Sequence, residues 1–276
     1  MKIKLIRITL LIIIIELACS CASMYIPSSA NIPLLESEGE KQVELTASTT
    51  SLNLSGDYAF SEKYACMFNG SASYGNFTNY YDIFTPKECE WKIDYYGILP
   101  IYAGEFSHRY GEIGIGRYNI LQNKIKLEIF GGIGYGQAND KKITTFENLN
   151  YNANYYLGFA QINFGKTTPK IDYGMSLRLA YSSFDFSSHD IYSNPNLSTD
   201  IVDSHKLIFN IYHGETMGFL RFGNNRIKCV VRIGFSIAKK EQSLENINLY
   251  RGIHLGNVNT TNILLSMGVN YKFGLN

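Results

Sequence analysis

The feature of this sequence that most constrains its fold is a strict alternation of apolar and polar residues over long stretches. In residues 125–136, Ile125 and Leu127 alternate with Lys126 and Glu128. Successive side chains of a β-strand point to opposite faces, so this pattern predicts a strand with one apolar and one charged face. The same alternation recurs in three further segments: residues 171–181, 226–237 and 263–273.

The length of these segments favours a membrane-spanning strand. They run for about 10–13 residues, whereas globular strands most often have about 5–6 and tilted membrane strands need about 9–11. The pattern in 206–222 slips near His213, which predicts a β-bulge there, and 152–165 also shifts its phase. Weaker strand segments bring the expected number to about ten: residues 42–49, 52–61, 64–75, 106–118, 152–165 and 206–222.

The charged faces indicate which side of the sheet is wet. Charges in mid-strand beside Gly and Ser suit a narrow lumen, with the apolar face turned toward lipid. A lipid-tethered soluble β-domain with its apolar face inward is the alternative. A barrel of this size leaves room mainly for side chains, which favours a closed ionic plug over a narrow channel. The expected lumen charges are Lys126, Glu128, Asp172, Arg178, Lys228, Arg232 and Lys272.

Connection lengths support an all-β, single antiparallel up-and-down transmembrane barrel. Short linkers at 62–63, 119–123, 166–169 and 223–225 alternate with long ones at 76–105, 139–150, 184–205 and 240–260. Outer-membrane barrels have short periplasmic turns and longer external loops. Ten strands then place both ends of the barrel on the short-turn side.

Composition agrees with strands and tight turns. The 276 residues include 21 Tyr, 16 Phe and 24 Gly but only one Trp and six Pro, a bias toward strand and turn formers. The formal net charge of +1 gives no sign of a nucleic-acid partner. Five scattered cysteines, with no CxxC and no HxxxH spacing, predict neither a disulfide framework nor a metal or cofactor site.

The first residues predict an export signal. Lys2, Lys4 and Arg7 precede the uncharged run Ile8 to Ile15, and small residues follow. A basic start, a short apolar stretch and small residues are typical of a secretory signal peptide, and the run is too short to span a bilayer. We therefore expect residues 1–20 to be a lipoprotein-type signal peptide.

The cysteines after this run resemble the lipobox of bacterial lipoproteins, in which a cysteine is acylated and becomes the new N-terminus. Cys21 is the favoured lipidation site and Cys19 the alternative. On this assignment residues 21–41 are a lipid-anchored tether and residues 42–276 form the β-barrel. Two acyl chains, such as palmitate, give stable anchoring where one is marginal.

Three motifs resemble the uncharacterised small outer-membrane β-barrel lipoproteins of Gram-negative bacteria. They are Cys21-Ala-Ser-Met-Tyr-Ile-Pro27, Asn31-Ile-Pro-Leu-Leu35 and Gly268-Val-Asn-Tyr-Lys-Phe273. The resemblance implies a location in the cell outer membrane, an N-terminal lipid anchor, and outer-membrane lipids and the assembly machinery as partners. Outer-membrane barrels usually end on an aromatic residue, whereas Gly274-Leu275-Asn276 follow Phe273 here.

The expected function is structural or a loop-mediated binding role toward an unidentified extracellular ligand, and not enzymatic. Tyr80, Tyr81, Trp91 and Tyr95 in the long loop 76–105 are the binding candidates, although such aromatics also pack loops or lie at membrane interfaces.

A rim hydrolase is the enzymatic alternative. A ten-strand barrel is similar to the omptin proteases, and that resemblance implies Asp and His residues at the outer rim. Candidates for such a His–Asp pair are His108, Asp185, His189, Asp190, Asp203, His205 and His254. No omptin-like motif and no Gly-x-Ser-x-Gly elbow occurs, so no catalytic residue is predicted.

Overall fold

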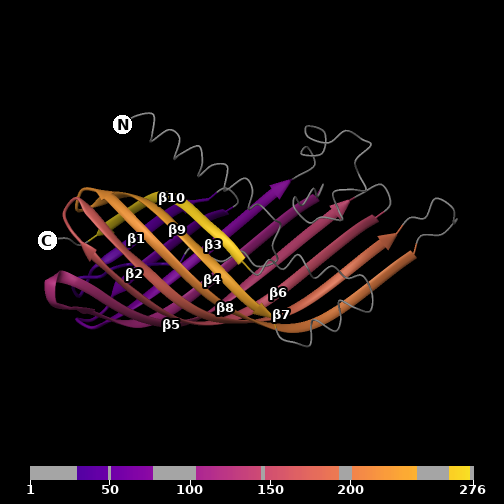
Figure 1. The fold of residues 1–276 in the computed structure, drawn as a ribbon, viewed down its shortest axis with the longest axis horizontal. Coiled ribbons are helices and arrows are strands. Elements are labelled where there is room, and N and C mark those ends of the chain that lie inside the picture. The colour runs from indigo at the N-terminus through magenta and orange to yellow at the C-terminus, as the bar shows by residue number, and fades with distance from the viewer. Residues whose placement is uncertain are drawn as a thin grey trace.

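The computed structural model describes residues 30–48, 51–76, 104–143, 147–192, 201–240 and 261–273, which form ten antiparallel strands closed into one barrel (Figure 1). This confirms the predicted fold class and strand number. None of the described residues forms a helix long and apolar enough to cross a membrane. The elements are β1 (Lys41–Ala47), β2 (Ser51–Ala59), β3 (Tyr64–Asn76), β4 (Gly104–Ile120), a 3-10 turn (Gln122–Lys124), β5 (Ile125–Ile143), β6 (Glu147–Thr167), β7 (Ile171–Tyr192), β8 (Ile201–Gly223), β9 (Ile227–Lys240) and β10 (Thr261–Phe273).

Every strand pairs with its chain neighbours, and β1 closes the barrel against β10. Lys41 lies opposite Phe273 and Ala47 opposite Met267 in this last pair. Lys41 also lies opposite Tyr58 of β2, just before the turn into β3. The first and last strands therefore begin and end at the mouth that carries the short turns, which we call the short-turn end.

The outer surface of the barrel is apolar and the inner surface polar. Buried side chains of the strands include carboxylates, guanidiniums and ammonium groups, whereas large aliphatic side chains are exposed. A soluble β-domain would show the reverse arrangement, and a barrel crossing a bilayer requires this one. Exposed apolar residues include Leu45, Leu54, Ile113, Ile129, Ile133, Leu177, Leu179, Leu220, Ile233, Phe235, Met267 and Val269.

Aromatic side chains mark two borders of this apolar belt. Near the short-turn end β7 exposes Tyr173 and β8 exposes Phe222. Farther along, β7 exposes Tyr181 against Tyr212 of β8, with ring centroids 5.0 Å apart. Eight to ten residues separate the two borders along these strands. At ~3.3 Å per residue and a tilt of about 40°, the belt is roughly 20–25 Å tall, as expected for an outer-membrane barrel.

Strands β5 to β8 continue well beyond the second aromatic border (Figure 1). The predicted loop 139–150 is mostly strand, because β5 runs to Ile143 and β6 starts at Glu147. The predicted loop 184–205 is likewise shortened, since β7 runs to Tyr192 and β8 starts at Ile201. Both loop predictions were wrong, and we call the extra strand length the projecting half of β5–β8.

The polarity of the two faces reverses in the projecting half. Beyond Tyr181 the outward side chains of β7 are Ser183, Asp185 and Ser187, while Phe184 and Phe186 point inward and are buried. Water outside and an aromatic core inside explain this reversal, because a strand above the bilayer obeys the rule for soluble proteins.

The same reversal explains the phase shifts in the sequence. Strand β8 pairs without interruption with both neighbours, so the bulge predicted near His213 is absent. Its inward positions keep strict alternation from Phe209 to Arg221. The apparent slip is a change of residue type on the inward face, from apolar Phe209 and Ile211 to polar His213 and Glu215, and not a change of register.

Candidate functional site

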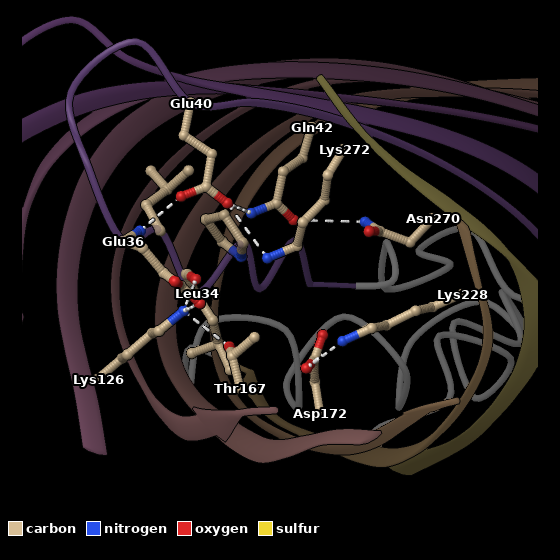
Figure 2. A network of polar contacts seen from close by, with 12 residues as sticks. Leu34, Glu36, Glu40, Gln42, Lys126, Thr167, Asp172, Lys228, Asn270 and Lys272 are labelled. Carbon is tan, nitrogen blue, oxygen red and sulfur yellow. Dashed lines mark hydrogen bonds and ion pairs between the residues drawn. The ribbon is translucent and has the colours of Figure 1, made fainter. Parts of the chain in front are cut away.

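All seven sequence-predicted lumen charges lie inside the barrel. These residues are only 0–4 % exposed. Each lies in the middle of its strand or near the short-turn end of it. Figure 2 shows Lys126, Asp172, Lys228 and Lys272 pointing inward from the wall. Their burial leaves little water-accessible space in this half of the lumen.

The first described residues of the expected tether, Ala30–Leu35, lie inside the barrel. Ala30, Ile32, Leu34 and Leu35 are 0–2 % exposed and occupy the lumen near the short-turn end. From Glu36 to Gly39 the chain is exposed, and it then enters β1. We call Ala30–Leu35 the luminal segment.

Side chains of the wall bind the main chain of the luminal segment. Five successive carbonyl groups, from Ala30 to Leu34, each accept a hydrogen bond from a long wall side chain. The donors are Arg232 to Ala30 O (2.8 Å), Gln161 to Asn31 O (2.6 Å), Arg221 to Ile32 O (2.6 Å) and Pro33 O (3.4 Å), and Lys126 to Leu34 O (2.6 Å).

Two further contacts run in the opposite direction. The Leu35 amide donates to Glu128 Oε1 at 2.7 Å, and the Asn31 side-chain amide donates to Asp57 Oδ1 at 2.7 Å. Because an unpaired buried amide or carboxylate is costly, these contacts fix both ends of the segment.

Ion pairs surround the segment. Glu44 pairs with Arg221 at 2.9 Å and also with Arg232. Asp172 pairs with Lys228 at 2.5 Å, across the lumen from Glu40 in Figure 2. Buried charges are tolerated only when paired, and these pairs make the wall of the lumen largely self-compensating.

The short-turn mouth holds two more pairs. Lys126 contacts Glu36 at 2.6 Å, and Lys272 contacts Glu40 at 3.2 Å. Glu36 lies outside the spanning strands. Its partial burial opposes ionisation, but the hydrogen bond and charge of Lys126, together with the charges of Lys272 and Lys228, hold the pKa of Glu36 below its ordinary value. These pairs tie the exposed turn to the wall.

A separate polar cluster lies farther from the short-turn end. The Arg178 guanidinium contacts both oxygens of Glu112, at 3.0 and 2.5 Å, and lies 3.5 Å from Glu215. It also lies 4.1 Å from the ring centroid of Phe159. A bidentate pair stacked on a ring immobilises the guanidinium and joins four strands across the lumen.

Above this cluster the lumen is filled with aromatic rings. His108 Nε2 lies 2.7 Å from the Tyr155 hydroxyl. Tyr155 stacks on Phe184 at 4.8 Å, and Phe184 stacks on Phe209 at 5.1 Å. His108 is thus buried in an aromatic stack and does not lie at the rim, where a hydrolytic role would need it.

Two of the other rim candidates lie on the exposed face of the projecting half. His189 and Asp185 lie on the outward face of β7, where His189 contacts Ser204 at 2.9 Å and Asp185 lies 3.6 Å from Lys206. Within the described ranges these residues form no His–Asp pair. No group of three His, Cys, Asp or Glu suited to a metal ion occurs there either.

Several predicted residues have side chains outside the described part of the structure. Asp190, Asp203 and His205 belong to β7 and β8 by their backbone only. The remaining predicted residues lie outside the described residues altogether: Cys19, Cys21, Tyr80, Tyr81, Trp91, Tyr95 and His254.

Sequence reasoning missed several members of the lumen network. They are Glu44, Glu112, Glu215 and Arg221, all on the weaker strand segments of the sequence. Glu44 stands between Val43 and Leu45, so strict alternation in β1 was a usable signal. The contacts of the luminal segment had no such signal, because they involve its main chain.

Neither models of protein families nor the curated proteins contain a match to this chain. Similar folds occur among solved structures. The outer membrane protease OmpT from Escherichia coli is 8 % identical, with a TM-score of 0.48 over 85 % of this chain and 93 % of that chain. A major outer membrane protein from Thermus thermophilus is 9 % identical, with a TM-score of 0.41 over 85 % and 99 %. The translocator domain of the autotransporter NalP from Neisseria meningitidis is 9 % identical, with a TM-score of 0.36 over 85 % and 86 %. These values assign no activity to this chain.

Proposed function

We propose that this protein is an outer-membrane barrel lipoprotein that acts as a rigid scaffold and presents the projecting half of β5–β8 to an extracellular partner. The observation that carries the proposal is the reversal of polarity along β7, from Leu177 and Leu179 outside to Ser183, Asp185 and Ser187 outside. The parts of the strands that extend beyond the bilayer enclose a core of their own. They therefore form a stable platform for the connections between strands.

The packed lumen supports a scaffold over a channel. The luminal segment and the Arg178 cluster occupy successive levels of the lumen, and their residues are almost fully buried. A water-filled pore would leave such side chains exposed.

The anchor is part of the proposal. Cys21, or alternatively Cys19, carries the acyl chains after removal of the signal peptide. Both lie upstream of the luminal segment, whose own chain enters β1 at the short-turn end. The orientation follows the rule that short turns face the periplasm.

Surface labelling of intact cells tests the orientation. We would replace Cys66, Cys89 and Cys229 by Ser, retain Cys19 and Cys21 for acylation, and introduce Ser187→Cys in the projecting half. A membrane-impermeant maleimide should label this variant in intact cells. The matched variant Lys63→Cys, in the turn between β2 and β3, should be labelled only after the outer membrane is opened. The reverse pattern would overturn the proposed orientation.

Two measurements test the scaffold itself. The protein extracted from outer membranes in mild detergent should change its gel mobility on boiling, as a closed membrane barrel does. Reconstituted in planar bilayers, it should give no stable conductance steps. Regular conductance steps from the intact chain would contradict the scaffold role and support the narrow channel.

A further inference from the structure

The luminal segment is bound as a ligand is bound. It forms no strand, and its main chain hydrogen-bonds to side chains of the wall, while its Asn31 side chain donates to Asp57. The donors come from four separate strands: Lys126 from β5, Gln161 from β6, Arg221 from β8 and Arg232 from β9. Such contacts are specific for an extended main chain with accessible carbonyl groups, and they do not depend on sheet pairing.

Apolar side chains of the segment pack against buried residues of the wall. Ile32 and Leu34 pack in one cluster with Met217 and Phe219 of β8, and Leu35 packs in the aromatic cluster on the other side. Pro33 lies between them and has no amide hydrogen that would need a partner. The site therefore fits an extended peptide with bulky apolar side chains around a proline.

One residue of the segment has an unusual backbone. Leu34 has a φ of 55°, in the left-handed region that disfavours a side chain. Its carbonyl nevertheless reaches Lys126 at 2.6 Å. The wall imposes this conformation on the segment, since the strain persists only where surrounding contacts over-determine it.

The wall retains partners when the segment is removed. Arg221 and Arg232 still share Glu44, and Lys228 still has Asp172. Lys126 keeps Thr167 Oγ1 at 2.7 Å but loses Glu36, and Asp57 loses the Asn31 amide. The charges of the site are thus balanced mainly by other residues of the barrel. This is expected of a binding site, whereas removing a segment that completes the fold would leave most of these charges unpaired.

We propose that the short-turn half of the lumen is a peptide-binding site, occupied in cis by Ala30–Leu35, and that it binds an unlinked extended apolar peptide of the same kind once this segment is detached. The inference does not depend on the proposed scaffold role. Attachment through the exposed turn gives the segment a high effective concentration, so the intact chain excludes competing peptides.

The test uses the full chain, cut after folding. A specific protease site inserted between Ser37 and Glu38, in the exposed turn, separates the segment from β1 without touching the wall. Heat-modifiability after cleavage reports whether the barrel is intact. A fluorescent synthetic peptide of residues 28–37 is then added in detergent, and its anisotropy and native mass spectrum are measured.

The expected result is saturable, one-to-one binding to the cut barrel, at least tenfold weaker binding of a scrambled peptide, and no binding to the uncut barrel. Gln161→Leu removes the donor to Asn31 O and should weaken binding about fivefold, the effect of one neutral hydrogen bond. Ser236→Ala is the matched control, because Ser236 is also buried on the wall but has no hydrogen bond to the segment among the described contacts. It should leave binding unchanged.

Three results would overturn the proposal. If the cut segment stays bound and no labelled peptide enters while the barrel remains heat-modifiable, the segment is a fixed part of the fold. If scrambled and native peptides bind alike to cut and uncut barrels, the binding is unspecific. Loss of heat-modifiability on cutting would show that the barrel needs the covalent segment, which also contradicts an exchangeable ligand.

Discussion

The two halves of strands β5–β8 follow opposite rules in one continuous sheet. In the belt, Leu177 and Leu179 of β7 face outward and Arg178 faces inward; in the projecting half, Ser183 and Asp185 face outward and Phe184 inward. The period of two is the same in both halves, and the hydrogen-bonded register does not change. The surrounding solvent therefore decides the polarity of each face, and the strand geometry only decides that there are two faces.

The interiors of the two halves differ accordingly. In the belt the lumen is held by hydrogen bonds and ion pairs that need each other, so removing one group leaves charges without partners. In the projecting half it is held by stacked rings, whose removal leaves a cavity. Mutations should therefore act across the lumen in the belt and locally in the projecting half.

The largest effect is expected for Glu44→Leu. Glu44 pairs with Arg221 and Arg232, and its removal leaves two buried guanidiniums short of a counter-charge. We expect a loss of about 5 kcal/mol in the free energy of unfolding, the upper end of the range for a broken buried pair. Urea unfolding of the refolded protein in vesicles, followed by gel mobility, measures it.

Glu38→Leu is the matched control, because Glu38 is exposed near the same mouth. Its effect should stay within about 0.5 kcal/mol. Equal effects of the two substitutions would show that the ionic network does not hold the belt together.

The next effect tests the aromatic interior. Phe184→Ala removes a ring that stacks on Tyr155 and Phe209, and we expect a loss of about 3–4 kcal/mol. The loss should be local, with faster hydrogen exchange in the outer ends of β6–β8 and unchanged heat-modifiability. Ser183→Ala, on the opposite face, should change neither. Faster exchange throughout the belt would contradict two independently stabilised halves.

A charge placed outside the strand sharpens the comparison directly. Leu177→Arg puts a guanidinium midway between Tyr173 and Tyr181, at the middle of the belt, and should destabilise the protein by about 2–3 kcal/mol. Ser187→Arg, on the same face of the same strand in the projecting half, should have an effect below about 0.5 kcal/mol. Urea unfolding in vesicles measures the loss of stability for both substitutions. Similar losses would show that the belt does not end at the second aromatic border.

The sequence was sufficient for the barrel and for the charged side of its lumen. Strict alternation around Lys126, Arg178 and Lys228 separates the charges from the aliphatic residues, and charges in mid-strand beside Gly and Ser favoured the lumen for the charged face. Strand number followed from counting such segments. Lipidation of Cys21 and ligand binding by the loop at 76–105 stay predictions.

The sequence was insufficient where the solvent changes along a strand. Polar residues such as Asn152 and Asn154 on the outward face of β6 resemble the edge of a loop, and inward rings such as Tyr155 disturb the apparent phase. The luminal segment is predicted as part of a tether, although Ile32 to Leu35 is an apolar run that water would not favour. Its binding by main-chain carbonyls leaves no mark on the sequence.

The smallest effect concerns the turn that joins the luminal segment to the barrel. Lys126 holds the pKa of Glu36 below its ordinary value of 4.5, against the opposing effect of burial. A carboxyl whose pKa is lowered by folding stabilises the folded state above its unfolded pKa, and this stabilisation is lost as the pH falls through the folded pKa. The contribution should be complete at pH 7 and should shrink as the pH falls below the ordinary pKa of 4.5.

Because the side chain of Glu36 is 46 % exposed, solvent screens the pair and the contribution should remain below about 1 kcal/mol. Urea unfolding of the native protein and of Glu36→Gln, measured from pH 3.5 to 7, should give a difference that shrinks toward zero at the acidic end. A difference that is independent of pH would mean that Glu36 acts through packing or its hydrogen bond alone. Ionic stabilisation of the described part of the lumen would then come from the fully buried pairs deeper in the belt. The turn would be a linker between the segment and β1 without a stabilising ion pair.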